Sequence, residues 1–188
     1  MPVISTVARV KGALRIPAAV TVWDVRIGEI LEDVEADALV EIGSPAWVAA
    51  YRTEVPRVTP GRTIALLEYF PVWAVSAATL SSGALVENTD FQWSSDGSLE
   101  LLTGSFSSVA RDFSVYYKAG PIETAGSTPS DLIRLVTLMA ARQYNLEGIA
   151  GLGSSSLRPI SKNVATADDD AVQAIIDGIL ARYRKPAG

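Results

Sequence analysis

The side chains that most often carry enzyme chemistry are missing from this sequence. It contains no histidine and no cysteine, which excludes a Ser-His-Asp triad, a cysteine nucleophile, a disulfide and a thiolate metal site. Ser-Lys pairs, carboxylate dyads and oxygen-only metal sites remain possible. Candidate chemistry must therefore be sought among acids, serines, lysines and glycine-rich segments.

Acidic side chains gather in residues 24–41, which carry seven acids against Arg26 alone. Oxygen ligands of this kind can bind a divalent cation, but a metal loop gathers its carboxylates around a tight turn. Because these acids lie along a helix, a solvated face is the favoured interpretation, although seven acids exceed what solubility requires. The acids are Asp24, Glu29, Glu32, Asp33, Glu35, Asp37 and Glu41.

Three further segments have a chemical interpretation and a plainer one. Asp168–Asp170 resemble a metal motif, but they also suit the start of a helix. Gly148–Gly153 lack the Lys-Ser/Thr ending of a phosphate loop and indicate a linker. Ser161 and Lys162 are neighbours in sequence, and such neighbours rarely face each other. We therefore expect no enzyme, no catalytic residue, no metal site and no cofactor.

The four tryptophans are spread over four predicted elements and could stack a ligand. Scattered in this way, they are more typical of core or interface positions. They are Trp23, Trp47, Trp73 and Trp93.

Length and charge narrow the remaining classes. The chain has 188 residues, 48% of them hydrophobic, which fits one domain with a core of its own. Its net charge of 16 − 21 = −5 is unfavourable for sequence-independent DNA binding. No apolar run approaches the roughly 18 residues of a membrane span, and no apolar stretch follows Arg9 and Lys11 as in a signal peptide. We expect a soluble protein without a membrane partner, made and used inside a cell or a particle.

Two helices are predicted in the first 62 residues. Residues 4–15 form a short helix capped by Ser5 or Thr6. Residues 24–42 form an amphipathic helix that ends at Gly43. Residues 43–62 are a connector that closes with a type II turn at 59–62.

Short strands follow in residues 63–120, and their short links favour antiparallel pairing. The residues Ser94-Ser95-Asp96-Gly97 predict a hairpin turn. The predicted strands are Thr63–Tyr69, Val72–Ala77, Phe91–Trp93, Leu99–Leu102 and Phe113–Lys118.

Two more helices close the chain. Residues 129–145 form a helix with apolar residues on most sides, so it is predicted to be the most buried. Residues 146–168 are a Gly- and Ser-rich flexible linker. Residues 169–185 form a sharply amphipathic helix, which either folds back on its own subunit or docks on a partner. Its stripe is Val172, Ile175, Ile176, Ile179, Leu180 and Tyr183, with Arg182 and Arg184 at its end.

The predicted fold class is α+β and mainly α. We expect a single domain over 1–188, built as a bundle of about four helices. A small antiparallel β element is inserted between the second and third helices.

The order of these elements resembles the head-tail connector, or adaptor, proteins of long-tailed bacteriophages. The resemblance covers about residues 4–185, and its specificity comes from the order of short motifs. They are the Asp24-started helix, Gly61-Arg62, Phe70-Pro71-Val72, Asp90-Phe91, Asp96-Gly97-Ser98-Leu99, Val115–Gly120, the Pro129-led helix and Tyr183-Arg184. The chain departs from the family with a longer connector at 43–58 and an insertion at 122–128.

The resemblance implies a structural virion protein without catalysis or cofactor. It implies a ring, commonly of twelve copies, between the portal and a downstream stopper or tail protein, assembled in the host cytoplasm. DNA would pass through the ring without specific binding. On this interpretation the last helix, with the stripe and arginines named above, docks on the portal. The carboxylates of Glu29, Glu32, Asp33 and Asp37 face the lumen and repel phosphates.

Two alternatives remain open. One is another neck or tail assembly protein, such as a stopper or tail terminator, although those are mostly β. The other is a small acidic enzyme or metal-binding domain, which calcium or magnesium retained after dialysis would favour.

Overall fold

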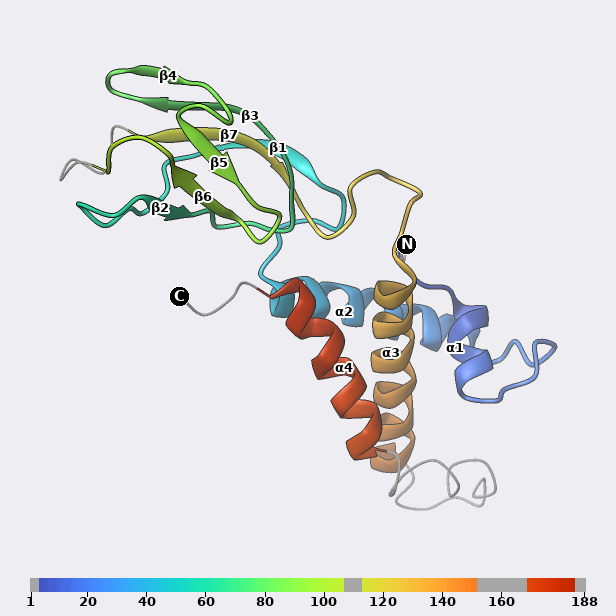
Figure 1. Ribbon diagram of the computed structural model, residues 1–188. Coiled ribbons are helices and arrows are strands. Elements are labelled where there is room, and N and C mark those ends of the chain that lie inside the picture. The colour runs from blue at the N-terminus through green and yellow to red at the C-terminus, as the bar shows by residue number, and fades with distance from the viewer. Residues whose placement is uncertain (1–3, 107–112, 152–168, 185–188) are drawn as a thin grey trace. The chain divides into compact units, whose positions relative to one another are not determined.

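Four helices and seven strands make up the described part of the chain, and the strands form two antiparallel sheets (Figure 1). The structure, a computed structural model, describes residues 4–106, 113–151 and 169–184. The chain divides into two compact units. The helical unit comprises Met1–Glu41 and Thr128–Arg182, and the strand unit comprises Ile42–Ser127 and Tyr183–Gly188.

The prediction of a mainly α bundle with one small β element is wrong. Seven strands are spread from Ala50 to Ala119, and they form a separate unit with a hydrophobic core of its own. Two of these strands were not predicted. β1, Ala50–Glu54, lies in the segment expected to be a connector, and β4, Gly83–Leu85, lies in a segment with no strand signal.

The helical unit contains α1 (Val7–Ala13), α2 (Asp24–Ile42), α3 (Ser130–Gly151) and α4 (Asp169–Tyr183). Thr6 caps α1, because its hydroxyl accepts a hydrogen bond from the Arg9 backbone N–H at 3.4 Å. The predicted apolar stripe of α2 is confirmed. Its members are fully or nearly fully buried: Ile27, Ile30, Leu31, Val34, Ala38 and Ile42.

α3 is longer than predicted. It continues to Gly151, inside the segment expected to be the linker. Its buried side chains are Leu132, Leu135, Val136, Ala140 and Ala141. Residues 152–168, which include the rest of the predicted linker, lie outside the described part of the chain.

The strand unit is built from a four-stranded and a three-stranded sheet. Besides β1 and β4, the strands are β2 (Ile64–Leu66), β3 (Val72–Leu80), β5 (Phe91–Trp93), β6 (Ser98–Leu101) and β7 (Ser114–Ala119). The four-stranded sheet has the order β1-β7-β3-β4 and the three-stranded sheet the order β2-β6-β5. Both sheets contribute to one core, including Leu99 and Leu101 from β6 and Val115 and Tyr117 from β7.

The two turns predicted from sequence are present. Gly61 has φ +77°, and the Arg62 backbone N–H donates to the Thr59 carbonyl at 3.1 Å, as in a type II turn. Gly97 has φ +85° and donates to the Ser94 carbonyl at 3.0 Å, closing the hairpin between β5 and β6. Asp96 accepts hydrogen bonds from the backbone and side chain of Ser98, which hold the pKa of Asp96 below its usual range.

Candidate assembly surfaces

The residues proposed for metal or phosphate chemistry do not come together in the described part of the chain. There, no group of three or more acids is placed to hold a metal ion. Asp170 is exposed on the first turn of α4. Asp168, Ser161 and Lys162, and the end of the glycine-rich segment, lie outside the described residues.

Two of the seven acids of α2 serve the interior of the helical unit. Asp24 accepts a hydrogen bond at 2.8 Å from the buried ammonium group of Lys11. Glu35 is only 6% exposed, and its Oε1 accepts from the backbone N–H groups of Ile4 at 2.8 Å and Ser5 at 3.2 Å. Placing Glu35 on a solvated acidic face is therefore wrong, because this carboxylate binds the backbone ahead of α1.

The other acids leave α2 with an exposed acidic face. Glu29, Glu32, Asp33 and Asp37 are all exposed. Glu29 pairs with Arg26 at 2.7 Å. Asp33 and Asp37 form no hydrogen bond or ion pair with the residues that the structure describes. That this face lines a channel stays a prediction.

Arg26 joins the start of α2 to the end of α3. It binds Glu29 within its own helix and Glu147 on α3, each at 2.7 Å. These carboxylates raise the pKa of Arg26 above its ordinary value. Beside this bridge, Trp23 packs edge-on against Tyr144 with ring centroids 6.4 Å apart.

Two valines that the sequence analysis passed over share the acidic face. Val25 is 76% exposed and Val40 is 79% exposed, which are the largest exposures among the bulky apolar side chains described. At 100° per residue, both project on the side of α2 that carries Glu29 and Asp33, away from the buried stripe. Their exposure could have been predicted from the sequence, because the helical spacing of Val25 and Val40 places them outside the buried apolar stripe of α2.

The apolar stripe of α4 is packed inside the helical unit. Ile176, Ile179 and Leu180 are 3%, 5% and 3% exposed. The other three members, Val172, Ile175 and Tyr183, are half-buried. The structure thus has α4 folded back on its own subunit, with Arg182 and Arg184 exposed. That α4 also docks on a portal stays a prediction.

Polar contacts fix α4 antiparallel to α3 (Figure 1). Near one end Arg142 donates a hydrogen bond to Gln173. Near the other, Arg182 lies 3.6 Å from Asp131. An open groove of about 450 Å³ lies between the C-terminal half of α4 and the start of α3. Its lining consists of Ser130, Asp131, Arg134, Ile175, Gly178, Ile179 and Arg182.

A polar cluster anchors β1 inside the strand unit. Tyr117 on β7 is fully buried, and its hydroxyl donates to Glu54 on β1. Glu54 also accepts from the Glu68 backbone N–H at 3.0 Å. Burial and the Glu54 carboxylate raise the pKa of Tyr117. The guanidinium of Arg52 stacks 4.2 Å over the ring of Tyr69.

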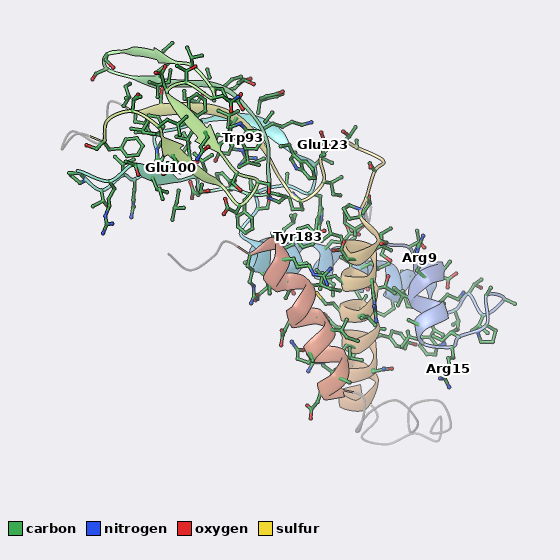
Figure 2. All side chains as sticks on the ribbon, viewed as in Figure 1. Arg9, Arg15, Trp93, Glu100, Glu123 and Tyr183 are labelled. Atoms are coloured by element: carbon green, nitrogen blue, oxygen red, sulfur yellow. The ribbon has the colours of Figure 1, made fainter. Side chains whose placement is uncertain are left out.

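The tryptophans do not form a ligand site. Trp47 is buried, whereas Trp73 donates to the Gly120 carbonyl at 2.8 Å. Trp93 donates to Glu87 at 2.8 Å and lies on the three-stranded sheet near Glu100 (Figure 2). Trp23 belongs to the helical unit and the other three to the strand unit, so each has a local packing role.

Comparison with solved structures finds the same fold in phage-like particles. A chain in the neck of a native GTA particle, computed with C12 symmetry, matches 97% of this chain and 89% of its own length, with 16% identity and a TM-score of 0.53. A chain in the neck of an empty GTA particle, computed with C6 symmetry, matches 97% of this chain and 90% of its own, with 18% identity and a TM-score of 0.52. A chain in the virion of the native gene transfer agent (GTA) particle gives 18% identity and a TM-score of 0.50 over the same shares. No family model and no curated protein matches the chain. No helix in the described residues is long and apolar enough to cross a membrane.

Proposed function

We propose that this chain is a structural subunit of the neck of a tailed, phage-like particle. Within the neck it acts as the head-tail adaptor: a ring under the portal that joins the DNA-filled head to the next neck or tail protein. The observation that carries the proposal is the shared fold with neck chains of GTA particles, over 97% of this chain. The order of sequence motifs supports the same class independently.

A ring is supported by the symmetry of those particles. The two necks were computed with C12 and C6 symmetry, each of which places copies around one axis. Subunits in a closed ring bury two different flanks against their neighbours. We therefore propose twelve copies in the virion, in contact with the portal on one side and a stopper or tail protein on the other. Portal docking through α4, with Arg182 and Arg184 exposed at its end, belongs to this proposal.

Passage of DNA requires a wall that does not hold it. The net charge of −5 and the exposed carboxylates of α2 disfavour phosphate binding. The proposal therefore includes DNA in transit and no specific DNA site.

A second candidate is another neck protein, such as a stopper. The strand unit, with seven strands in two sheets, is larger than the adaptor resemblance led us to expect, and this favours the alternative. The two roles differ in position, since an adaptor contacts the portal and a stopper does not.

The test is a particle-producing strain that lacks this chain. We expect DNA-filled heads without attached tails, and recovery of complete particles when the chain is supplied. Electron microscopy of wild-type particles should place a tagged copy beside the portal. Complete tailed particles in the absence of the chain would overturn the proposal, and a tag located away from the portal would favour the second candidate.

A further inference from the structure

The exposed face of α2 combines two exposed apolar side chains with carboxylates that have no ionic partner among the described residues. Val25 and Val40 are 76% and 79% exposed, and between them Asp33 and Asp37 have no ionic partner among the described residues. If this face were exposed to solvent in the assembled protein, the apolar surface of both valines would remain in contact with water. A face covered by another protein would bury them and give the carboxylates partners.

The groove between α3 and α4 has complementary properties. Arg134 and Arg182 line it, and the side chain of Arg182 is 69% exposed. Arg134 is exposed and makes no ion pair with any residue the structure describes. Asp131 also lines the groove, but Arg182 lies 3.6 Å from it. The apolar part of the lining comes from Ile175 and Ile179.

Gly178 leaves open space along the groove. It lies in the interior of α4, where glycine is less favourable than alanine. A Cβ atom added there would meet no other atom within 4 Å, so packing inside the subunit does not require this glycine. Close approach by an outside helix would give it a purpose.

The two surfaces belong to the same helical unit but to different helices. The groove is lined only by residues of α3 and α4, and the acidic face belongs to α2. A contact between one surface and the other on the next copy is heterologous, and repetition of such a contact around an axis closes a ring.

We infer that the acidic face of α2 around Asp33, Asp37 and Val40 docks in the Arg134–Arg182 groove of an adjacent copy of this chain. This inference rests on the proposed ring. It places Asp33 and Asp37 at the joint between subunits, where the sequence analysis had expected them to face the lumen. Val40, one turn from Asp37, enters the apolar part of the groove, and the carboxylates of Asp33 and Asp37 face the arginines at its rim.

Cysteine crosslinking tests this contact cleanly, because the natural chain has no cysteine. The variant Asp37→Cys with Arg134→Cys is expressed in a producing strain, and purified particles are treated with a short bismaleimide. We expect a ladder of crosslinked copies that ends at the size of the closed ring. Each single variant should give at most a minor dimer. Asp37→Cys with Arg9→Cys is the geometric control, since Arg9 lies on α1 and outside the groove (Figure 2).

Charge reversal supplies a second, independent readout. Asp37→Arg and Arg134→Glu should each reduce the incorporation of the chain into particles about tenfold or more, because like charges then face each other. The double variant should restore incorporation to within a few-fold of wild type. Within a single copy, neither Asp37 nor Arg134 forms an ion pair with a described residue. The melting temperature of the purified chain should therefore be unchanged.

The outcomes separate the inference from the proposed function. Particles that contain the double-cysteine chain but yield no ladder, with no rescue by the charge-swapped double variant, overturn the contact and leave the neck role intact. A wild-type chain absent from particles overturns the neck role itself. A ladder of crosslinked copies, together with restored incorporation of the charge-swapped double variant, establishes the contact between subunits.

Discussion

The buried ammonium group of Lys11 and the carboxylate of Asp24 lie 2.8 Å apart and tie α1 to the start of α2. The same ammonium donates to the Ala18 carbonyl at 3.0 Å and to the Val20 carbonyl at 2.6 Å. Each of its three protons therefore has an acceptor, which is why a lysine that is 4% exposed is tolerated. This one side chain fixes the loop between the two helices.

Replacement of Lys11 by methionine should therefore destabilise the helical unit. Asp24 and two carbonyl groups lose their donor, and we expect a cost of about 1–3 kcal/mol in the free energy of unfolding. Urea denaturation followed by circular dichroism measures it. Arg9→Met, at an exposed position of α1, is the matched control and should change stability by less than about 0.5 kcal/mol. Equal stability of both variants would show that the triple contact is not formed in solution.

The stripe of α4 gives the sharpest test of where that helix belongs. Ile176→Asp combined with Ile179→Asp places two carboxylates at positions that are 3% and 5% exposed. Since buried charges without partners cost several kcal/mol, the melting temperature of the chain should fall sharply. Ala174→Asp with Ala181→Asp, at exposed positions of the same helix, should melt like wild type. If the isoleucine variant instead melts normally but no longer joins heads, α4 is a docking helix, as the resemblance implied.

Gly120 packs against the backbone of Ala49, the residue directly before β1. Its φ is +152°, and a Cβ atom there would lie 2.7 Å from the Cα atom of Ala49. Gly120→Ala should cost about 1–3 kcal/mol or more, because strain and overlap add. Gly126→Ala is the control, with φ +87° but no atom within 4 Å of the added Cβ, so it carries only the backbone strain of about 1–2 kcal/mol. Thermal melts should rank wild type above Gly126→Ala and that above Gly120→Ala. The reverse order of the two variants would contradict the close approach.

The helices could be predicted because their apolar periodicity and end signals are local features of the sequence. α2 begins at Asp24 and ends before Gly43 as its apolar period and end signals indicate. β1 was missed because its five residues carry Arg52 and Glu54, which look solvated in sequence. Their environment is set by Tyr69 and Tyr117, far along the chain, and no local pattern can encode that. Glu35 was misplaced for the same reason, since its partners precede α1.

The candidate surfaces divide in a similar way. The acids at 29, 32, 33 and 37 were readable from helical spacing, because only one face of α2 can be buried. The groove could not be predicted from the sequence, because Arg134 and Gly178 lie on two helices whose alignment depends on tertiary packing. The number of charged residues carries no information about which faces of the helices meet.

Tyr117 should make the strand unit sensitive to alkaline pH. Its pKa is raised in the folded state by burial and by Glu54, so the folded chain keeps the proton that the unfolded chain loses above about pH 10. The stability contributed by this phenol is fully present below pH 10 and is lost as pH rises through the folded pKa. Tyr117→Phe removes the hydrogen bond to Glu54 and should cost about 1–3 kcal/mol at pH 7.

The difference between wild type and Tyr117→Phe is the informative quantity. It should shrink as pH rises from about 9 to 11, because phenylalanine has no proton to lose. Tyr51→Phe, at an exposed tyrosine, should follow the wild-type pH profile. A constant difference between Tyr117→Phe and wild type across this range would show that Tyr117 does not keep its proton preferentially in the fold.

The chain should not bind duplex DNA at about 0.15 M salt. Non-specific DNA binding depends on cations that displace counterions from phosphates, and this chain has a net charge of −5 with exposed carboxylates along α2. A gel-shift titration of the purified chain should therefore show no complex at micromolar concentration. Asp33→Lys with Asp37→Lys removes two acids and adds two bases, so its net charge is −5 + 4 = −1. Weak binding by this variant, lost as salt increases, would show that the carboxylates of Asp33 and Asp37 keep DNA off the free chain. Salt-sensitive micromolar binding by the wild type would contradict passage of DNA without retention.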